Sequence, residues 1–409
     1  MYQKTVLPNG IRVVTEHLPY VRSVSLGIWF ETGSRDETLE QRGYSHLIEH
    51  LAFKGTGKYS ARAIAEIMDT SGGHLNAFTG KEHTCYYARI LDEHFDQAAD
   101  ILREMLLNSL YDPVEIDKER GVILEEIKMY EDTPDEMVHD LFCEALWPQH
   151  ALGRNILGDR SSIKRAGRDN LRSFVQTYYT ADRLVVAAAG NIDHQRVVDE
   201  VAAAFDSLAP VSPDNRVTPA AHGADTLKKQ KDTEQVHLCI GGPGLARDDE
   251  RKYALYILDT ITGGGMSSRL FQELREERGL VYSTFSYHSS YADTGSFTLY
   301  AGFSPEHYQQ VIDVIETQLL SLTREPIGED ELQRAKSQLK GSLMLSLEST
   351  TNRMTRLARG EMNFGKLFGP DEIAAAVDAV TGEDLYALAQ DLFRMDRFSI
   401  AAIGPLNGI

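Results

Sequence analysis

Short runs rich in Val, Ile, Thr and other strand-forming residues open the chain. Asn9-Gly10 lies between two of these runs, and this dipeptide favours the tight turn that joins two antiparallel strands. The pattern therefore predicts sheet structure, with strands at residues 5–7, 11–15 and 23–30 and a β-rich segment over 74–90.

Apolar residues spaced three or four positions apart predict amphipathic helices in the segments that follow. Ser60 stands at the start of the first such segment, where its hydroxyl can cap a helix. We expect helices over residues 60–68, 92–109 and 113–130.

Near the middle of the chain this pattern weakens into prolines and polar residues, which is typical of a linker between domains. The second half then repeats features of the first, since Glu306-His307-Tyr308 follows Glu93-His94-Phe95 by 213 positions. A chain of 409 residues also exceeds the usual size of one hydrophobic core. We therefore expect two homologous α+β domains, at 1–210 and 233–409, joined by a linker at 211–232.

Composition narrows the possible partners and compartment. The formal net charge is −19, from 61 acidic and 42 basic side chains. This charge argues against nucleic-acid binding, because such binding depends on Lys and Arg. A cationic or neutral partner fits the charge better, and the alternative is that the acidic residues only keep the protein soluble. Three scattered cysteines favour reduced thiols and a cytoplasmic location. No secretory signal or membrane-spanning stretch is visible, so no membrane association is expected.

The segment His46-Leu47-Ile48-Glu49-His50 carries the clearest chemistry. On a helix, positions 46 and 50 lie about 40° apart, so both imidazoles can bind one ion while Glu49 stands beside them. A carboxylate there can take a proton from metal-bound water, and the motif therefore predicts a hydrolytic zinc centre. The alternative is a pair of histidines with a purely structural role.

A catalytic zinc site needs a third protein ligand and one position left open for water. The helix predicted over 113–130 offers Glu119, Glu125 and Glu126. Positions 119 and 126 lie within about 20° of the same helix face, so one can bind the metal while the other supports a histidine. Helix geometry does not decide between Glu125 and Glu126.

Longer segments resemble the pitrilysin and insulin-degrading-enzyme family of zinc peptidases with an inverted H-x-x-E-H motif, most closely the branch of the mitochondrial processing peptidase. The resemblance runs over nearly the whole chain and rests on LPNGIRVV, HLIEHLAFKGT, HLNAFTGKEHTCYYARI, ERGVILEEIKMYEDTPDE and GGGMSSRLFQELREERGLVYSTFS. It implies two mainly antiparallel sheets covered by helices, the processing-peptidase/LuxS-like metallohydrolase fold.

Position by position, the resemblance implies roles for the candidate residues of the first half. His46 and His50 become zinc ligands, and Glu49 becomes the general base. Glu126 matches the third ligand, and Glu119 matches an acidic residue that assists the site. The first domain is therefore expected to be the catalytic one.

The resemblance also implies residues that bind an extended peptide substrate. Asn76, Ala77 and Phe78 match an edge strand that pairs with the substrate backbone. Arg275 and Tyr282 match residues that position the substrate carbonyl and stabilise the oxyanion. Two acidic positions match a site for an arginine near the scissile bond, Glu136 and Asp140.

We therefore expect a zinc-dependent endopeptidase that cleaves extended or unfolded peptides, with a preference for basic residues. Shifted by 213 to 216 positions, the histidine motif falls on residues 259–266, which contain no His or Glu, so one zinc per chain is expected. Relatives with two further domains enclose a chamber, which implies a homodimer here. The alternative function is a non-catalytic core subunit of the same fold, and the same ligands also accept cobalt or manganese.

Overall fold

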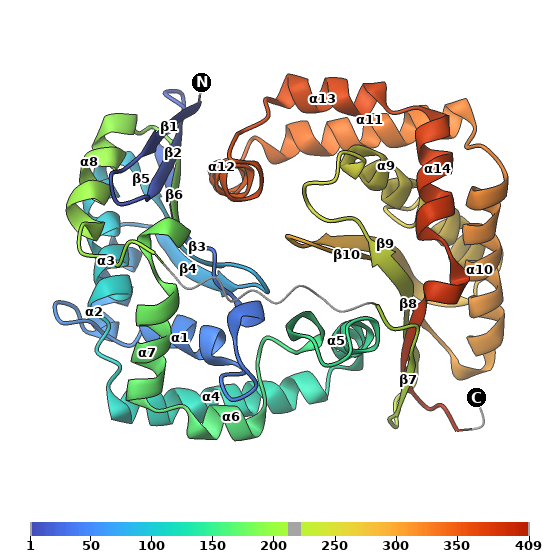
Figure 1. Ribbon diagram of the computed structural model, residues 1–409, viewed down its shortest axis with the longest axis horizontal. Helices are drawn as coiled ribbons and strands as arrows, with labels where there is room; N and C mark the ends of the chain where they lie inside the picture. Colours follow the sequence, from blue (N-terminus) through green and yellow to red (C-terminus); the bar gives the residue numbers. More distant parts are fainter. Residues whose placement is uncertain (1, 212–221, 408–409) are drawn as a thin grey trace. The chain divides into compact units, whose positions relative to one another are not determined.

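The computed structural model describes residues 2–211 and 222–407, and these form two compact units (Figure 1). Unit 1 comprises the described residues of 1–128, 155–217 and 346–367. Unit 2 comprises those of 129–154, 218–345 and 368–409. Neither unit is therefore one continuous stretch of sequence.

Unit 1 contains a six-stranded sheet in the order β1-β2-β6-β3-β5-β4. Only β2 and β6 pair in parallel among its described strands. The predicted hairpin is confirmed, because β1 and β2 pair antiparallel on either side of Asn9-Gly10. The strands are β1 (Tyr2–Val6), β2 (Arg12–His17), β3 (Ser23–Phe30), β4 (His74–Thr79), β5 (Thr84–Leu91) and β6 (Leu184–Gly190).

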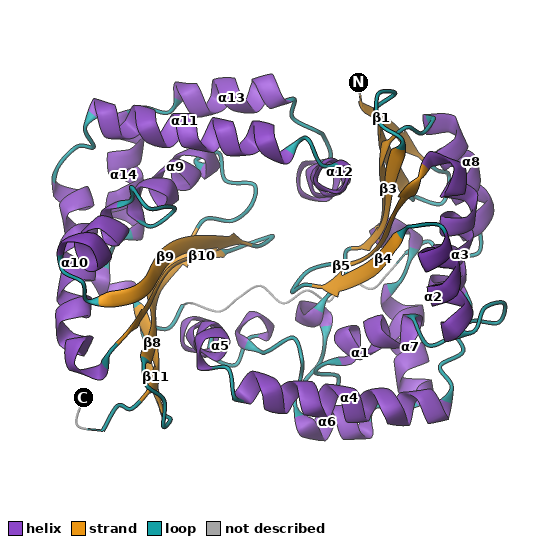
Figure 2. Cartoon of the chain, turned by 180° about the vertical axis from the view of Figure 1, so that it is seen from behind, coloured by secondary structure: helices purple, strands orange, loops and turns teal. Residues whose placement is uncertain are grey.

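Unit 2 contains a five-stranded sheet in the order β7-β11-β8-β10-β9. Figure 2 labels β8, β9, β10 and β11 of this sheet. This order matches β2-β6-β3-β5-β4 strand for strand, and β7 and β11 form the corresponding parallel pair. The predicted duplication of an α+β unit is therefore confirmed. The strands are β7 (Thr226–Gln230), β8 (Val236–Gly244), β9 (Val281–Ser290), β10 (Gly295–Phe303) and β11 (Ser399–Gly404).

One strand lies where the sequence predicted a linker. β7 falls within 211–232, and its side chains are exposed except for Leu227, which is half-buried. An edge strand with such a polar pattern is hard to distinguish from a connecting segment. Residues 212–221 of the expected linker lie outside the described residues.

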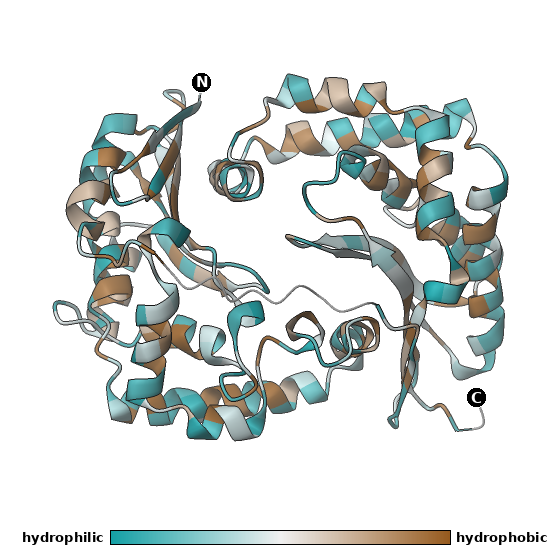
Figure 3. Cartoon of the chain, in the orientation of Figure 1, coloured by the Kyte–Doolittle hydropathy of each residue, from teal (hydrophilic) through white to brown (hydrophobic). Residues whose placement is uncertain are grey.

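The main core of each unit lies between one face of its sheet and the helices that cover it. Figure 3 shows hydrophobic and hydrophilic residues mixed along α10 and α11, as expected for helices that bury one face.

The predicted helices at 60–68, 92–109 and 113–130 are confirmed, with a short 3₁₀ turn before α3. Unit 1 carries α1 (Tyr44–Ala52), α2 (Ala61–Thr70), α3 (Phe95–Leu107), most of α4 (Pro113–Glu131), α6 (Arg160–Arg165), α7 (Arg168–Tyr178) and α8 (His194–Phe205). Unit 2 carries α9 (Lys252–Thr262), a π-helix (Phe271–Glu277), α10 (Tyr308–Arg324), α11 (Glu329–Ser346), α13 (Pro370–Ala379) and α14 (Gly382–Leu392).

The two units exchange one helix each. The helix α5 (Pro134–Leu146) comes from the first half of the chain but packs on β8 and β11 of unit 2, where Val138 and Phe142 are buried. The helix α12 (Thr350–Phe364) comes from the second half but packs on β2, β3 and β6 of unit 1 (Figure 1). There the indole nitrogen of Trp29 donates to the sulfur of Met354 at 3.3 Å.

The compact units therefore differ from the contiguous domains 1–210 and 233–409 that the sequence suggested. The physical reason is that an amphipathic pattern specifies a buried face but not which sheet that face covers. Both exchanged helices cover equivalent strands, since β8 and β11 correspond to β3 and β6.

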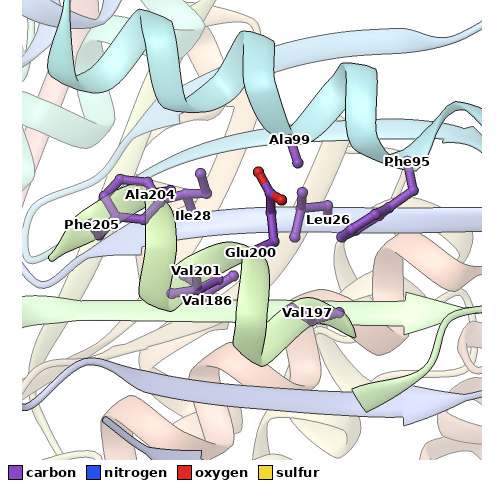
Figure 4. A pocket seen from close by; sticks show the side chains of 10 residues that line it. All are labelled: Leu26, Ile28, Phe95, Ala99, Val186, Val197, Glu200, Val201, Ala204 and Phe205. Carbon is purple, nitrogen blue, oxygen red and sulfur yellow. The ribbon is translucent and has the colours of Figure 1, made fainter. Parts of the chain in front are cut away.

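A crevice between α3 and α8 is too small to bind a ligand (Figure 4). Its volume of about 10 Å³ holds one water molecule at most. The lining is apolar apart from Glu200, whose side chain extends between the two helices. In the part of the chain that the structure describes, no helix is long and apolar enough to cross a membrane.

Candidate metal centre

The metal-binding candidates come together on two helices of unit 1. His46 and His50 lie on α1, and Glu126 lies on α4. One donor atom from each residue lies within 4.8 Å of the other two. The Nε2 atoms of His46 and His50 are each 3.9 Å from a carboxylate oxygen of Glu126. Among the described residues, this is the one group of His, Cys, Asp or Glu whose spacing suits a metal ion.

The packing of α1 explains why both histidines face α4. Leu47, Ile48 and Leu51 are buried in the main core of unit 1. With 3.6 residues per turn, anchoring that face leaves His46 and His50 together on the adjoining side. Their ring centroids lie 4.6 Å apart.

A remote carboxylate caps the start of α1. Glu37 is buried, and its two oxygens accept hydrogen bonds from the backbone N–H groups of Gly43 at 2.8 Å and Ser45 at 2.7 Å. The N-cap residue Gly43 has no side chain that could do this, and its φ of 85° suits glycine. Glu37 therefore stabilises the helix that carries both histidines. The sequence analysis did not predict this role.

Replacing Glu37 by alanine is expected to destabilise unit 1 by about 1–3 kcal/mol, because it leaves two buried N–H groups without an acceptor. Chemical denaturation followed by circular dichroism measures this change, and zinc affinity should fall with it. Glu40→Ala is the matched control, since Glu40 is exposed in the same loop and should change stability by less than about 0.5 kcal/mol. Equal effects of the two substitutions would contradict the capping role.

The structure shows that Glu125 and Glu126, between which helix geometry did not decide, face in different directions. Glu125 is exposed and pairs with Lys128 on the surface of α4. Glu126 faces the two histidines instead. Glu119 is buried, with Oε2 at 3.0 Å from Nδ1 of His50.

Glu119 also forms an ion pair with Lys54, a residue that the sequence analysis did not single out. The Nζ atom of Lys54 lies 2.8 Å from Oε1 of Glu119. This contact offsets the cost of burying the carboxylate. A carboxylate on Nδ1 fixes the imidazole of His50 with Nε2 directed at Glu126, as is usual around metal-binding histidines.

The electrostatics of His46 suit a metal ligand. Burial, with a smaller contribution from His50, lowers the pKa of His46 to about 4, so the imidazole is neutral near pH 7. Neutral imidazole is the form that binds metals. Its buried Nδ1 has no hydrogen-bond partner among the residues that the structure describes. Two imidazoles and one carboxylate are a donor set of catalytic zinc sites, and the residues present therefore fit this ion.

Glu49 lies beside this group on α1 with a perturbed carboxyl group. Burial raises the pKa of Glu49, while a hydrogen bond from Thr79 opposes the rise. The hydroxyl of Thr79, at the end of β4, donates to Oε2 of Glu49 at 2.5 Å. Thr79 directly follows the predicted substrate-binding segment but was not itself predicted.

The predicted substrate-binding residues of unit 1 lie on an edge strand. Asn76, Ala77 and Phe78 belong to β4, which occupies the end of the sheet. Among the described strands, β4 pairs with β5 alone. Within this strand, the backbone N–H of Ala77 donates to Oδ1 of Asn76 at 2.8 Å.

The other predicted substrate-binding residues all lie in unit 2. The guanidinium of Arg275 lies over the ring of Phe271 at 5.0 Å, and Tyr282 on β9 is 61% exposed. Glu136 is in the first turn of α5, and Asp140 accepts a hydrogen bond from Tyr130 at 2.5 Å. Their roles toward a substrate stay predictions.

The corresponding place in unit 2 has different chemistry. There α9 and β9 correspond to α1 and β4, and Asp259 of α9 accepts hydrogen bonds from two residues of β9. Ser286 donates to Oδ1 at 2.5 Å, and Nδ1 of His288 lies 2.8 Å from Oδ2. Both carboxylate oxygens are thus engaged within unit 2. The expectation of one zinc per chain stays a prediction.

Comparisons with known proteins give a consistent result. A family model described as "Insulinase (Peptidase family M16)" matches residues 12–160, and one described as "Peptidase M16 inactive domain" matches residues 165–339. The chain is 45% identical to the uncharacterized zinc protease YmxG of Bacillus subtilis, over 99% of this chain and 98% of that protein. It is 37% identical to an uncharacterized zinc protease of Rickettsia felis, over 98% of this chain and 96% of that protein.

Two solved structures share the fold. A protease from Helicobacter pylori matches with a TM-score of 0.91 at 23% identity, over 98% of this chain and 99% of that chain. A peptidase M16 inactive domain from Pseudomonas fluorescens matches with a TM-score of 0.92 at 20% identity, over 99% of this chain and 98% of that chain.

Proposed function

Because the chain belongs to peptidase family M16, the insulinase family, we propose that it is a zinc-dependent endopeptidase with Glu49 as its general base. The observation that carries this proposal is the convergence of His46, His50 and Glu126 within 4.8 Å, with Glu49 on the same helix as the two histidines. The names of the relatives support a metallopeptidase.

The reaction is hydrolysis of an internal peptide bond. His46, His50 and Glu126 would hold a zinc ion, which would lower the pKa of a bound water to about 7 and polarise the substrate carbonyl. Glu49 takes the proton of the attacking water and then gives it to the nitrogen of the leaving amine. Glu119 keeps His50 in the orientation that the metal requires.

The substrate is an extended or unfolded peptide. Its backbone pairs with the free edge of β4 at Asn76–Phe78, so that main-chain hydrogen bonds supply affinity for many sequences. Arg275 positions the carbonyl, and Tyr282 donates to the oxyanion. Glu136 and Asp140 receive a basic side chain, in line with the net charge of −19.

Zinc removal is the first test of this function. A chelator is expected to abolish cleavage of a quenched fluorescent peptide that contains an internal arginine, and one equivalent of zinc should restore it. Failure of zinc to restore cleavage, with the protein still folded, would overturn the metallopeptidase assignment.

Glu126→Gln is expected to weaken zinc binding by about 10- to 100-fold or more, because a neutral amide is a much poorer ligand than a carboxylate. Glu125→Gln is the matched control on the next residue of α4, where the side chain faces solvent, and should bind zinc like the wild type. Competition with a fluorescent chelator measures both affinities. The opposite ranking of the two variants would assign the third ligand to Glu125.

The second candidate function is a non-catalytic core subunit of the same fold. The complete set of His46, His50, Glu126 and Glu49 favours the enzyme, since a purely structural subunit has no need of these groups. A wild-type protein that binds zinc yet cleaves no peptide of a broad mixture would favour the core subunit.

We further propose that the protein acts as a homodimer in the cytoplasm. The dimer follows from the resemblance to relatives with four domains. Among the described residues, Cys85, Cys143 and Cys239 form no disulfide, in accord with a reducing compartment. Light scattering of the purified protein distinguishes one chain from two, and fractionation of cells tests the location.

A further inference from the structure

The hydroxyl of Thr79 contacts the proposed general base, Glu49. The Oγ1 atom of Thr79 donates to Oε2 of Glu49 at 2.5 Å. Among the described residues, Thr79 is the only hydrogen-bond partner of the Glu49 side chain. The second carboxylate oxygen of Glu49, Oε1, therefore accepts no hydrogen bond from the described residues.

The pleat of β4 directs the Thr79 side chain toward α1. Alternate residues of a strand point to the same face, so Thr79 shares a face with Ala77. Ala77 is buried in the core that also contains Leu47 and Ile48 of α1. Phe78 points to the opposite face, where its ring lies 5.3 Å from that of Trp29.

The end of β4 is held in place by its surroundings. The turn after Thr79 is closed by a hydrogen bond from Gly80 N–H to the carbonyl of His83 at 2.8 Å. A preceding loop fixes the same turn, because Ser34 N–H donates to the carbonyl of Gly80 at 3.1 Å. A Cβ atom at Gly33 would lie 2.3 Å from the Gly80 oxygen, so this close approach requires glycine.

A buried ion pair further anchors this turn. Arg35 and Glu82 are both buried, and their side chains are joined at 2.5 Å. The backbone N–H of Arg35 also donates to the carbonyl of Lys81 at 2.8 Å. The hydroxyl of Thr79 is therefore presented to Glu49 from a rigid point of the fold, as accurate positioning of a reacting group requires.

We propose that Thr79 is a positioning residue that fixes the orientation of the Glu49 carboxylate during peptide hydrolysis. The inference rests on the proposed role of Glu49 as general base. Thr79 occupies Oε2, so the proton of the attacking water is transferred to Oε1. That proton then leaves Oε1 for the amine nitrogen of the product, and the hydrogen bond to Oε2 persists through both transfers.

The test compares Thr79→Val, Thr79→Ser and a control variant, Thr84→Val, with the wild type, each as the zinc-loaded protein. Thr79→Val keeps the shape of the side chain but removes the hydroxyl, and should lower kcat by about 10- to 100-fold with KM changed by less than about threefold. Thr79→Ser keeps the hydroxyl and should retain kcat within about threefold. Zinc content should be the same in all samples.

Thr84→Val is the matched control. Thr84 pairs with Thr79 across the hairpin, and its hydroxyl donates to the carbonyl of Thr32 at 2.9 Å. Loss of this buried hydrogen bond should lower Tm and leave kcat unchanged. A positioning role predicts the reverse for Thr79→Val, with a large fall in kcat and little change in Tm.

Crystal structures of the wild type and of Thr79→Val give a readout that does not depend on activity. If the Glu49 carboxylate changes its orientation in Thr79→Val, the positioning role is supported. A wild-type protein that shows this change in structure but cleaves no peptide contradicts only the proposed function. The positioning role is overturned if the Glu49 side chain is unchanged in the variant, if an active wild type and Thr79→Val share the same kcat, or if Thr79→Ser is as impaired as Thr79→Val.

Discussion

Replacing Glu49 by glutamine is expected to lower kcat/KM by about 10³-fold or more, with zinc retained. Glutamine has nearly the same shape, and its carbonyl can still accept the hydrogen bond from Thr79, but it cannot take a proton from water. The measurement is cleavage of a quenched fluorescent peptide with an internal arginine, alongside zinc content by mass spectrometry. Because the metal ligands are unchanged, the fall reports on proton transfer rather than on metal loss.

Glu125→Gln is the control for this experiment as well. It makes the same chemical change on an exposed residue of α4 and should leave kcat/KM within about twofold of the wild type. Wild-type activity in Glu49→Gln would remove Glu49 from the mechanism and assign proton transfer to another group.

Separating the chain into fragments 1–211 and 222–409 is expected to abolish the folding of each fragment, while mixing them restores it. The first fragment lacks α12, whose residues Met354, Leu357 and Ala358 are buried against the sheet of unit 1. Their burial contributes on the order of 5 kcal/mol, which is comparable to the whole stability of a typical domain. Circular dichroism and zinc binding of the fragments, alone and mixed, measure the effect.

The two tryptophans separate the behaviour of the two units. Trp29 is buried beneath α12 in unit 1, and Trp147 is buried in unit 2 beside Leu152. In a Trp147→Phe background, the fluorescence of Trp29 reports on unit 1 alone. Cooperative unfolding and zinc binding of fragment 1–211 by itself would show that α12 is dispensable.

Leu357→Asp provides the same test in the intact chain. It places a charge at a position that is 1% exposed and should destabilise unit 1 by about 3–5 kcal/mol. Unit 1 should then lose zinc binding, although Leu357 lies far from every ligand in the sequence. Glu348→Asp, at an exposed position just before α12, is the control and should leave the Trp29 signal unchanged.

The local patterns of the sequence predicted the segments that contain β1–β5 and α2–α4, since strand-forming runs and helical spacing act over a few residues. They also predicted the placement of His46, Glu49 and His50 on one helix, because this depends only on the helical repeat. The strand β7 escaped prediction, as its polar pattern matched that of a linker.

Features that depend on long-range packing could not be predicted in this way. Local patterns do not distinguish Glu125 from Glu126. The resemblance implied Glu126, and the structure shows this residue facing the histidines while Glu125 pairs with Lys128. Glu37 and Thr79 act on α1 from other elements, and isolated Glu and Thr residues carry no pattern that indicates such contacts. The exchange of α5 and α12 escaped prediction because amphipathicity does not specify a partner sheet.

The helix exchange also sets the order of events during synthesis on the ribosome. Domains usually fold as units from the N-terminus while the chain emerges. Here unit 1 includes residues 346–367, so the metal-bearing unit cannot be completed until most of the 409 residues have been translated. After the last proposed metal ligand, some two hundred further residues have by then been added, which takes about 10–40 seconds at synthesis rates of roughly 5–20 residues per second. The nascent protein thus spends that interval with its metal ligands already synthesised but with unit 1 unfolded, because the helix that covers one face of its sheet has not yet been made.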